Sequence, residues 1–199
     1  MSKTAPATVS PLFVTELYRA DLGTQSGFED FLAELDDTCR AIADEDEAGQ
    51  TWSQTKGYLG YTSYASLNDL PVRASVFADL KTILDAHVVT FADKLDSMWI
   101  NILEPMGHHS SHIHPHSVIS GTFYVSIPEG ASALRLEDPR LGLMMNAPLR
   151  KANGKPEHQN FVCATPLAGT VLMWESWLRH EVPINLSDDV RISVSFNYG

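Results

Sequence analysis

The stretch 108–128 reads HHSSHIHPHSVISGTFYVSIP, and the expected fold is built outward from it. Three of its histidines, His112, His114 and His116, recur at every second position. Since alternate side chains of a strand point to one face, His112 and His114 are predicted to present two imidazoles side by side, as two ligands of one metal ion would. Pro115 has no amide proton to donate to a strand ladder, so the strand is expected to fray there, and His116 stays an alternative ligand to either of the others.

A segment of strand character follows the histidines directly. Residues 122–125 (TFYV) are β-branched or aromatic, which favours a strand, and Ser120 and Gly121 are interpreted as a turn or bulge before it. The neighbouring His108 and His109 are interpreted as part of a solvated loop. Neutral imidazole suits iron, zinc, copper and nickel alike, so the histidines predict a metal site without naming the ion.

Composition and charge restrict the class of protein. The chain has 199 residues, 44% of them apolar, which predicts a single domain spanning 1–199, with a helical part over 1–96 and a β-rich core over 97–199. The net charge is −11 and the lysines and arginines form no cluster, so neither a nucleic acid nor an anionic membrane is an expected partner.

The two cysteines and the apolar runs bear on the compartment. Cys39 and Cys163 lack the C-x-x-C spacing of metal sites and are predicted to be buried free thiols. The first 14 residues hold no apolar run of signal-peptide length, and nowhere do 18 apolar residues follow one another. We therefore expect a soluble cytoplasmic protein.

The first half of the chain has helical character. Near-alternation of apolar residues within 11–22 predicts a first strand, and apolar residues at three- and four-residue steps predict amphipathic helices over 27–48 and 72–94. Between them, 52–71 is aromatic and loop-like. His87 lies close to the apolar stripe of the second helix and is interpreted as a core or boundary histidine, not as a ligand.

From residue 97 onward the pattern changes to short alternating segments broken by Gly, Pro, Asn and Asp. Strands are predicted over 98–103, 121–127, 133–137, 160–164, 170–174 and 191–198. Several short strands after two helices predict an antiparallel sandwich or barrel with the helices packed outside it.

The last of these strands, RISVSFNY, carries a polar face. Alternation places Arg191, Ser193, Ser195 and Asn197 together. An ordinary outer strand would turn this face to water, whereas a barrel with a site inside would turn it inward. Arginine suits such a pocket because its planar fork binds a carboxylate through two parallel, charge-assisted hydrogen bonds.

A loop upstream of this strand is expected to deliver His180. A pair of histidines from one strand and a single histidine from a later strand form a three-ligand facial site that leaves the opposite positions open. Trp174 and Trp177 are expected to pack beside this site. Asp138 and Arg140 are interpreted either as substrate contacts at its mouth or as a turn held by an Asp–Arg pair.

Three segments, HIHPHSVISGTFYVSIPEG, LRLEDPR and SWLRHEVPINLSDDVRISVSFN, resemble the 2-oxoglutarate- and iron(II)-dependent dioxygenases. Within that superfamily they are similar to the prolyl-hydroxylase-like part, and more narrowly to an uncharacterised group of bacterial and phage 2OG-Fe(II) oxygenases. The resemblance covers residues 97–199 in order, whereas the first half of the chain matches only in its general helical character. It implies a double-stranded β-helix, or jelly roll, with iron bound at its open end.

The resemblance also implies roles for individual residues. In the family's H-x-D/E…H motif, the two histidine positions fall on His112 and His180, and the middle position, normally a carboxylate, falls on His114. This departure leaves three imidazoles and no negative charge in the ligand set. The residues implied to bind 2-oxoglutarate are Arg191, which would hold its far carboxylate, with Tyr124 and Ser193 beside it.

The implied activity couples oxidative decarboxylation of 2-oxoglutarate, giving succinate and CO2, to hydroxylation of a co-substrate. Two alternatives stay open: a three-histidine iron dioxygenase that binds its organic substrate directly, and a jelly-roll module that uses the metal without turnover. The co-substrate is expected to be a small molecule or a peptide that the sequence does not identify. A homodimer is compatible with the sequence.

Overall fold

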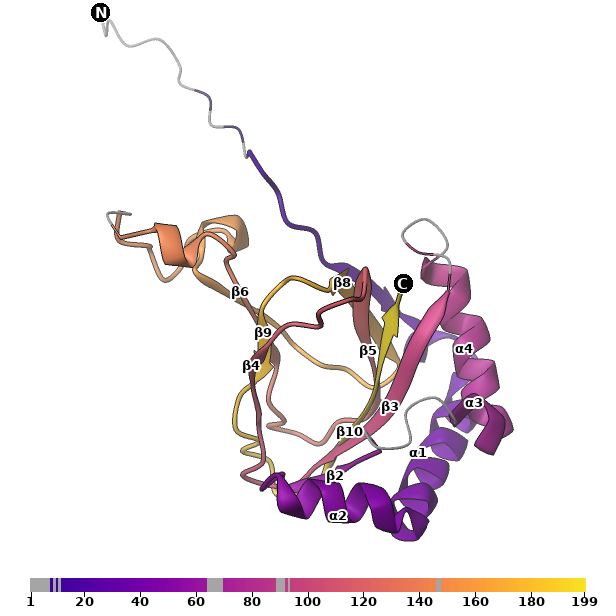
Figure 1. Cartoon of the computed structure of the whole chain (residues 1–199). Coiled ribbons are helices and arrows are strands. Elements are labelled where there is room, and N and C mark those ends of the chain that lie inside the picture. The colour runs from indigo at the N-terminus through magenta and orange to yellow at the C-terminus, as the bar shows by residue number, and fades with distance from the viewer. Residues whose placement is uncertain are drawn as a thin grey trace, which may run out of the picture.

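The core of the computed structural model is two antiparallel sheets that face each other (Figure 1). The structure describes residues 8, 10, 12–63, 70–88, 92, 94–145 and 148–199. The larger sheet has the order β1-β8-β5-β10-β3-β2, with the strands Tyr18–Asp21, Thr170–Glu175, Ile119–Ser126, Arg191–Tyr198, Leu95–Leu103 and Gly60–Thr62. The smaller has the order β4-β9-β6-β7, with the strands His109–His112, His180–Val182, Leu134–Glu137 and Phe161–Ala164.

Helices lie against the outer side of the larger sheet (Figure 1). They are α1 (Phe28–Glu45), α2 (Glu47–Thr55), α3 (Leu70–Arg73) and α4 (Ser75–Val88), and three short 3-10 turns are η1 (Leu22–Thr24), η3 (Leu141–Leu143) and η4 (Pro156–His158). This arrangement, a double-stranded β-helix with helices packed on it from the N-terminal half, confirms the predicted fold class. No helix among the described residues is long and apolar enough to cross a membrane.

Helices form where they were predicted, but their observed bounds differ from the predicted ones. The first, predicted over 27–48, breaks at Asp46, whose side chain accepts a hydrogen bond from the amide of Gly49 and so caps the separate helix α2. The second, predicted over 72–94, is observed as α4 with the small α3 before it, and 89–91 and 93 lie outside the described residues. Of the loop predicted over 52–71, part forms the end of α2 and strand β2, and 64–69 lie outside the described residues.

Strand β10 separates two apolar clusters, because each of its faces is buried. Ile192, Val194 and Phe196 pack in the cluster that includes the helices. The opposite face carries Arg191, which is only 2% exposed, and Ser193. The prediction that the polar face of this strand points inward is therefore confirmed, and it places polar side chains between the two sheets.

Gly121 does not form the predicted turn or bulge with Ser120. Both residues lie inside β5, where Gly121 is paired directly with Phe196 of β10. A Cβ atom at Gly121 would collide with the Phe196 ring and would lie 2.7 Å from the carbonyl oxygen of Leu172. Glycine is thus required by close packing, not by a turn.

We expect Gly121→Ala to destabilise the fold by about 1–3 kcal/mol, the usual effect of forcing an extra carbon into a packed core. Gly142 is the matched control, because a Cβ atom there meets nothing within 4 Å. Urea unfolding of both variants measures the difference. A Gly121→Ala midpoint equal to that of Gly142→Ala would contradict this account of the packing.

The two cysteines have different environments. Cys39 is fully buried in α1, as predicted, and burial raises the pKa of its thiol. Cys163 is exposed, so its predicted burial is wrong. The reason is that Cys163 is the cross-strand partner of Arg135, so it projects from the face of the smaller sheet opposite to the inward-facing Leu136 and Val162.

Candidate metal centre

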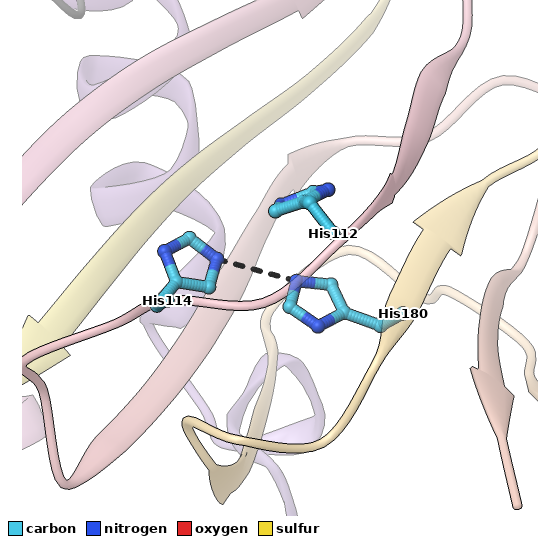
Figure 2. Close-up of side chains that lie close together, drawn as sticks. All are labelled: His112, His114 and His180. Atoms are coloured by element: carbon cyan, nitrogen blue, oxygen red, sulfur yellow. Dashed lines mark hydrogen bonds between the residues drawn. The ribbon is translucent and has the colours of Figure 1, made fainter. Parts of the chain in front are cut away.

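Three histidines from two neighbouring strands converge between the sheets (Figure 2). His112 ends β4, His114 follows two residues later, and His180 begins β9. His112 and His180 are direct cross-strand partners. One ring nitrogen from each of the three lies within 4.8 Å of the other two, and Nε2 of His114 is 3.3 Å from Nε2 of His180. The arrangement suits a single metal ion bound by three imidazoles.

Backbone carbonyls orient two of these rings. Nδ1 of His180 donates to the carbonyl oxygen of Leu178 at 2.8 Å, and Nδ1 of His112 donates to that of Ser110 at 2.6 Å. A hydrogen on Nδ1 leaves the lone pair on Nε2, which is the form in which a neutral histidine ligates a metal. Both rings are therefore fixed with Nε2 available.

Burial keeps two of the rings neutral. Desolvation, with the neighbouring histidines adding to it, lowers the pKa of His180 to about 3 and that of His114 to about 4. Trp174 packs against His180 with 4.8 Å between ring centroids, and Trp99 lies beside His114. At neutral pH no proton on His114 or His180 has to be displaced before a metal binds.

The structure also places the histidines that do not join the cluster. The strand ends at His112, three residues earlier than the predicted fraying at Pro115, so His114 already lies outside it. His116 is exposed, with a φ of 74° in the turn that includes Pro115. Nδ1 of His87 shares a hydrogen bond of 2.6 Å with the hydroxyl of Tyr18, which confirms its assignment as a boundary histidine. No aspartate or glutamate among the described residues belongs to the cluster.

Arg191 lies in the same interior and has no acidic partner among the described residues. Among the described residues, Nη1 of Arg191 donates to the hydroxyl of Ser193 at 3.3 Å, and the buried Nε has no partner. The guanidinium carbon is 5.0 Å from the ring centroid of Tyr124, whose buried hydroxyl is also without a partner. A buried cation left unpaired is costly, so an anion bound beside Arg191 would stabilise this part of the interior.

Two further residues lie near Arg191, and the sequence analysis did not identify either of them. The hydroxyl of Tyr58 and Nε2 of His109 share a hydrogen bond of 2.6 Å. The interpretation of His109 as part of a solvated loop is wrong, because it begins β4 and is half-buried. Burial first, and the charge of Arg191 second, lower its pKa to about 3. A pair of neutral groups therefore stands near Arg191.

The sequence held only an indirect signal for this pair. Tyr58 comes two residues before Gly60, and Gly60, Leu103 and Arg191 form one row across β2, β3 and β10. Strand β2 has three residues, too few to produce a readable alternation. The aromatic character of 52–71 was the available signal, but it did not indicate which histidine a tyrosine of this segment would contact.

The remaining predicted residues lie at the edge of the site. Asp138 and Arg140 form an ion pair with 2.8 Å between Oδ2 and Nη2, and the backbone amide of Arg140 also donates to Asp138, as the turn interpretation expects; both residues also line a cavity, so they stay candidates for substrate contacts. Arg140 lowers the pKa of the Asp138 carboxyl. Trp177 is half exposed and absent from the packing around the histidines.

Fold and site together define a jelly-roll protein with a three-histidine candidate metal centre and a buried arginine between its sheets. A family model described as "Putative 2OG-Fe(II) oxygenase" matches residues 97–197, and the chain belongs to this family. A search of curated proteins found no match.

Solved structures of similar fold cover nearly the whole chain. A prolyl-4-hydroxylase from Pseudomonas putida is 15% identical with a TM-score of 0.58, covering 92% of each chain. HygX from Streptomyces hygroscopicus, with nickel, 2-oxoglutarate and hygromycin B bound, is 15% identical with a TM-score of 0.60, covering 93% of this chain and 83% of HygX. The epimerase SnoN, with Fe3+ and alpha ketoglutarate, is 13% identical with a TM-score of 0.65, covering 92% and 78%. At these identities the likeness concerns the fold.

Proposed function

We propose that the chain is an iron(II)- and 2-oxoglutarate-dependent dioxygenase that hydroxylates a co-substrate and releases succinate and CO2. The observation that carries the proposal is Arg191, a buried guanidinium on the inner face of the larger sheet. It has no carboxylate partner in the part of the chain that the structure describes. Family membership and the fold support it.

The residues present fit both groups. His112, His114 and His180 would hold the iron, and the bound iron supplies the activation of dioxygen. Arg191 would hold the far carboxylate of 2-oxoglutarate through its fork, with the hydroxyls of Ser193 and Tyr124 as further donors. Burial raises the pKa of the Tyr124 hydroxyl, so this group keeps its proton and can donate it.

Three imidazoles leave the charge of a divalent ion uncompensated. An anionic chelating co-substrate supplies the missing negative charge, so the departure from the family's carboxylate favours binding of a keto acid at this site. Two tasks fall to the chain's own residues: Leu178 and Ser110 hold the imidazoles in their ligating form, and Arg191 sets the orientation of the bound anion.

Anaerobic absorption spectroscopy tests the proposal. Adding 2-oxoglutarate to the iron(II)-loaded protein should produce a visible charge-transfer band, because a keto acid that chelates iron through its 1-carboxylate and 2-keto oxygens accepts charge from the metal. Glutarate, which has both carboxylates and no keto group, is the control and should give no band. Iron binding without a band for 2-oxoglutarate would contradict the proposal.

The ligand set favours a second candidate, a three-histidine iron dioxygenase that binds its organic substrate directly on the metal. In that case Arg191 would hold a carboxylate of the substrate itself. Succinate formation separates the two candidates, since only the first consumes 2-oxoglutarate. A non-catalytic jelly-roll module would give neither succinate nor an oxidised product.

Tyr58→Phe tests whether the Tyr58–His109 pair near Arg191 contributes to anion binding. We expect 2-oxoglutarate affinity to fall about 3- to 10-fold, because the hydrogen bond that fixes His109 contributes about 0.5–1.5 kcal/mol. Tyr18→Phe is the matched control, since its hydroxyl bonds His87 at the same distance outside the site. Calorimetric titration on manganese-loaded protein measures both. Equal dissociation constants of 2-oxoglutarate for the two variants would show that Tyr58 does not contribute to its binding.

A further inference from the structure

The face of the smaller sheet that carries the metal cluster continues across two more strands. His112 of β4 is the direct partner of His180 in β9, His180 is the partner of Leu136 in β6, and Leu136 is the partner of Val162 in β7. Directly opposed residues of neighbouring strands project from the same face. Leu136 and Val162 therefore face the same interior as the two histidines.

A cavity of about 520 Å³ begins at this apolar end of the row. Its floor is made by Leu136, Val162 and Leu178, and the carbonyl of Leu178 is the one that holds Nδ1 of His180. The opposite wall is the extended segment 12–17, which precedes β1. Figure 1 shows this segment passing beside the arm that links β6 to β7, and residues of that arm close the third side.

Apolar side chains dominate the two long walls. Segment 12–17 contributes Leu12, Phe13, Val14 and Leu17, of which Phe13 is 89% exposed. A monomeric protein seldom exposes several large apolar side chains together without a ligand or partner to cover them. Here they face a cavity whose volume lies in the range for small-molecule sites, roughly 300–1,000 Å³.

The charged residues that line the cavity carry both signs, with Glu16, Glu137, Asp138 and Glu157 against Arg140 and Arg150. Arg140 is paired with Asp138, and Glu157 with Lys155 at 3.7 Å. The arrangement lacks the concentration of one sign that binds a phosphate or a polyamine. The walls therefore favour a ligand that matches the cavity in shape and has an apolar surface.

The strand spacing relates the cavity to the metal centre. Neighbouring strands lie about 4.8 Å apart, so Leu136 is one step and Val162 about 10 Å from His180 along the row. None of the three histidines lines the cavity, so a bound molecule must extend past Leu136 to stand beside the metal. This distance suits a substrate, one end of which must stand beside the metal.

We propose that this cavity binds the co-substrate, and that the co-substrate is a small molecule with an uncharged, apolar body. The inference rests on the proposed function and names its substrate class. Segment 12–17 acts as the outer wall of the site, and Val162 and Leu136 set how deep the apolar body enters.

Fluorine NMR with 1-fluoronaphthalene, a neutral apolar probe, tests the inference without turnover. The fluorine line should broaden on adding metal-free protein, because the probe exchanges with a large molecule. Manganese(II), bound at the three histidines and checked by electron paramagnetic resonance, should broaden it further, since paramagnetic relaxation at about 10 Å is strong. Zinc(II) is the diamagnetic control.

Val162→Trp places a much larger side chain at the floor of the cavity and should weaken both effects while manganese(II) still binds. Leu186→Trp, at a position that is 76% exposed and outside the cavity lining, is the matched control and should keep both. The wild-type measurement with manganese(II) and zinc(II) does not depend on how either variant folds.

Each of the following outcomes would contradict one part of the inference. No broadening by metal-free protein, or a folded Val162→Trp that retains it in full, shows that the cavity is not the binding site. Broadening without an added effect of bound manganese(II) separates the cavity from the metal centre. A hydrophobic tetrapeptide that displaces the probe at lower concentration than naphthalene does would assign the site to a peptide. A protein that takes up no manganese(II) contradicts the proposed function, and the inference falls with it.

Discussion

Replacing His180 by glutamine is expected to reduce the affinity for iron(II) or manganese(II) by at least about 100-fold. Changing only a group that orients a ligand commonly costs 10- to 100-fold in metal affinity, and removing the ligand itself exceeds that. His180 is buried, is held by Leu178 and faces both other histidines, so no neighbouring side chain can take its place. Competitive titration of manganese(II), followed by electron paramagnetic resonance, measures the loss.

His116→Gln is the matched control for this loss. It removes a histidine from the same stretch as His112 and His114, but its side chain is exposed and lies outside the cluster. Its metal affinity should equal that of the wild type. If His116→Gln lost the metal and His112→Gln kept it, the ligand pair would be displaced by two residues along the chain.

Alternation and helical periodicity predicted the parts of the fold that depend on local sequence. Strand β10 was predicted over its observed length because eight residues alternate without interruption, and the inward direction of its polar face followed from placing a site inside the barrel. The helix boundaries were less accurate, since the cap at Asp46 divides a continuous apolar stripe into two helices. Local pattern alone does not contain that division.

The features that sequence reasoning missed all depend on pairs far apart in the chain. Tyr58 and His109 are 51 residues apart, and Gly121 meets Phe196 from the neighbouring strand. The exposure of Cys163 follows from its pairing with Arg135 on the outward face of the smaller sheet, which becomes known only with the register. Register and strand order are set by the packing of the whole domain, so a single sequence leaves them undetermined.

The second large effect is expected for Arg191→Met, which should lower 2-oxoglutarate affinity by about 30-fold to several thousand-fold. Losing a charge-assisted, two-point partner in a buried pocket costs about 2–5 kcal/mol. Methionine keeps the length and apolar stem of the side chain, so it can still pack against Tyr124. Metal affinity should stay close to that of the wild type, because Arg191 is not a ligand.

Anaerobic calorimetric titration of 2-oxoglutarate into manganese-loaded protein measures this loss. Arg40→Met is the control, since Arg40 pairs with Asp36 on α1, outside the larger sheet, and its loss should leave the dissociation constant unchanged. Arg191 carries its charge with no acid to neutralise it, so removing it can also stabilise the empty protein. If the role of Arg191 is to bind a carboxylate, Arg191→Met should unfold at a higher urea concentration than the wild type and should bind 2-oxoglutarate weakly. An unchanged dissociation constant with the metal still bound would assign Arg191 to another anion and favour the three-histidine dioxygenase that uses no keto acid.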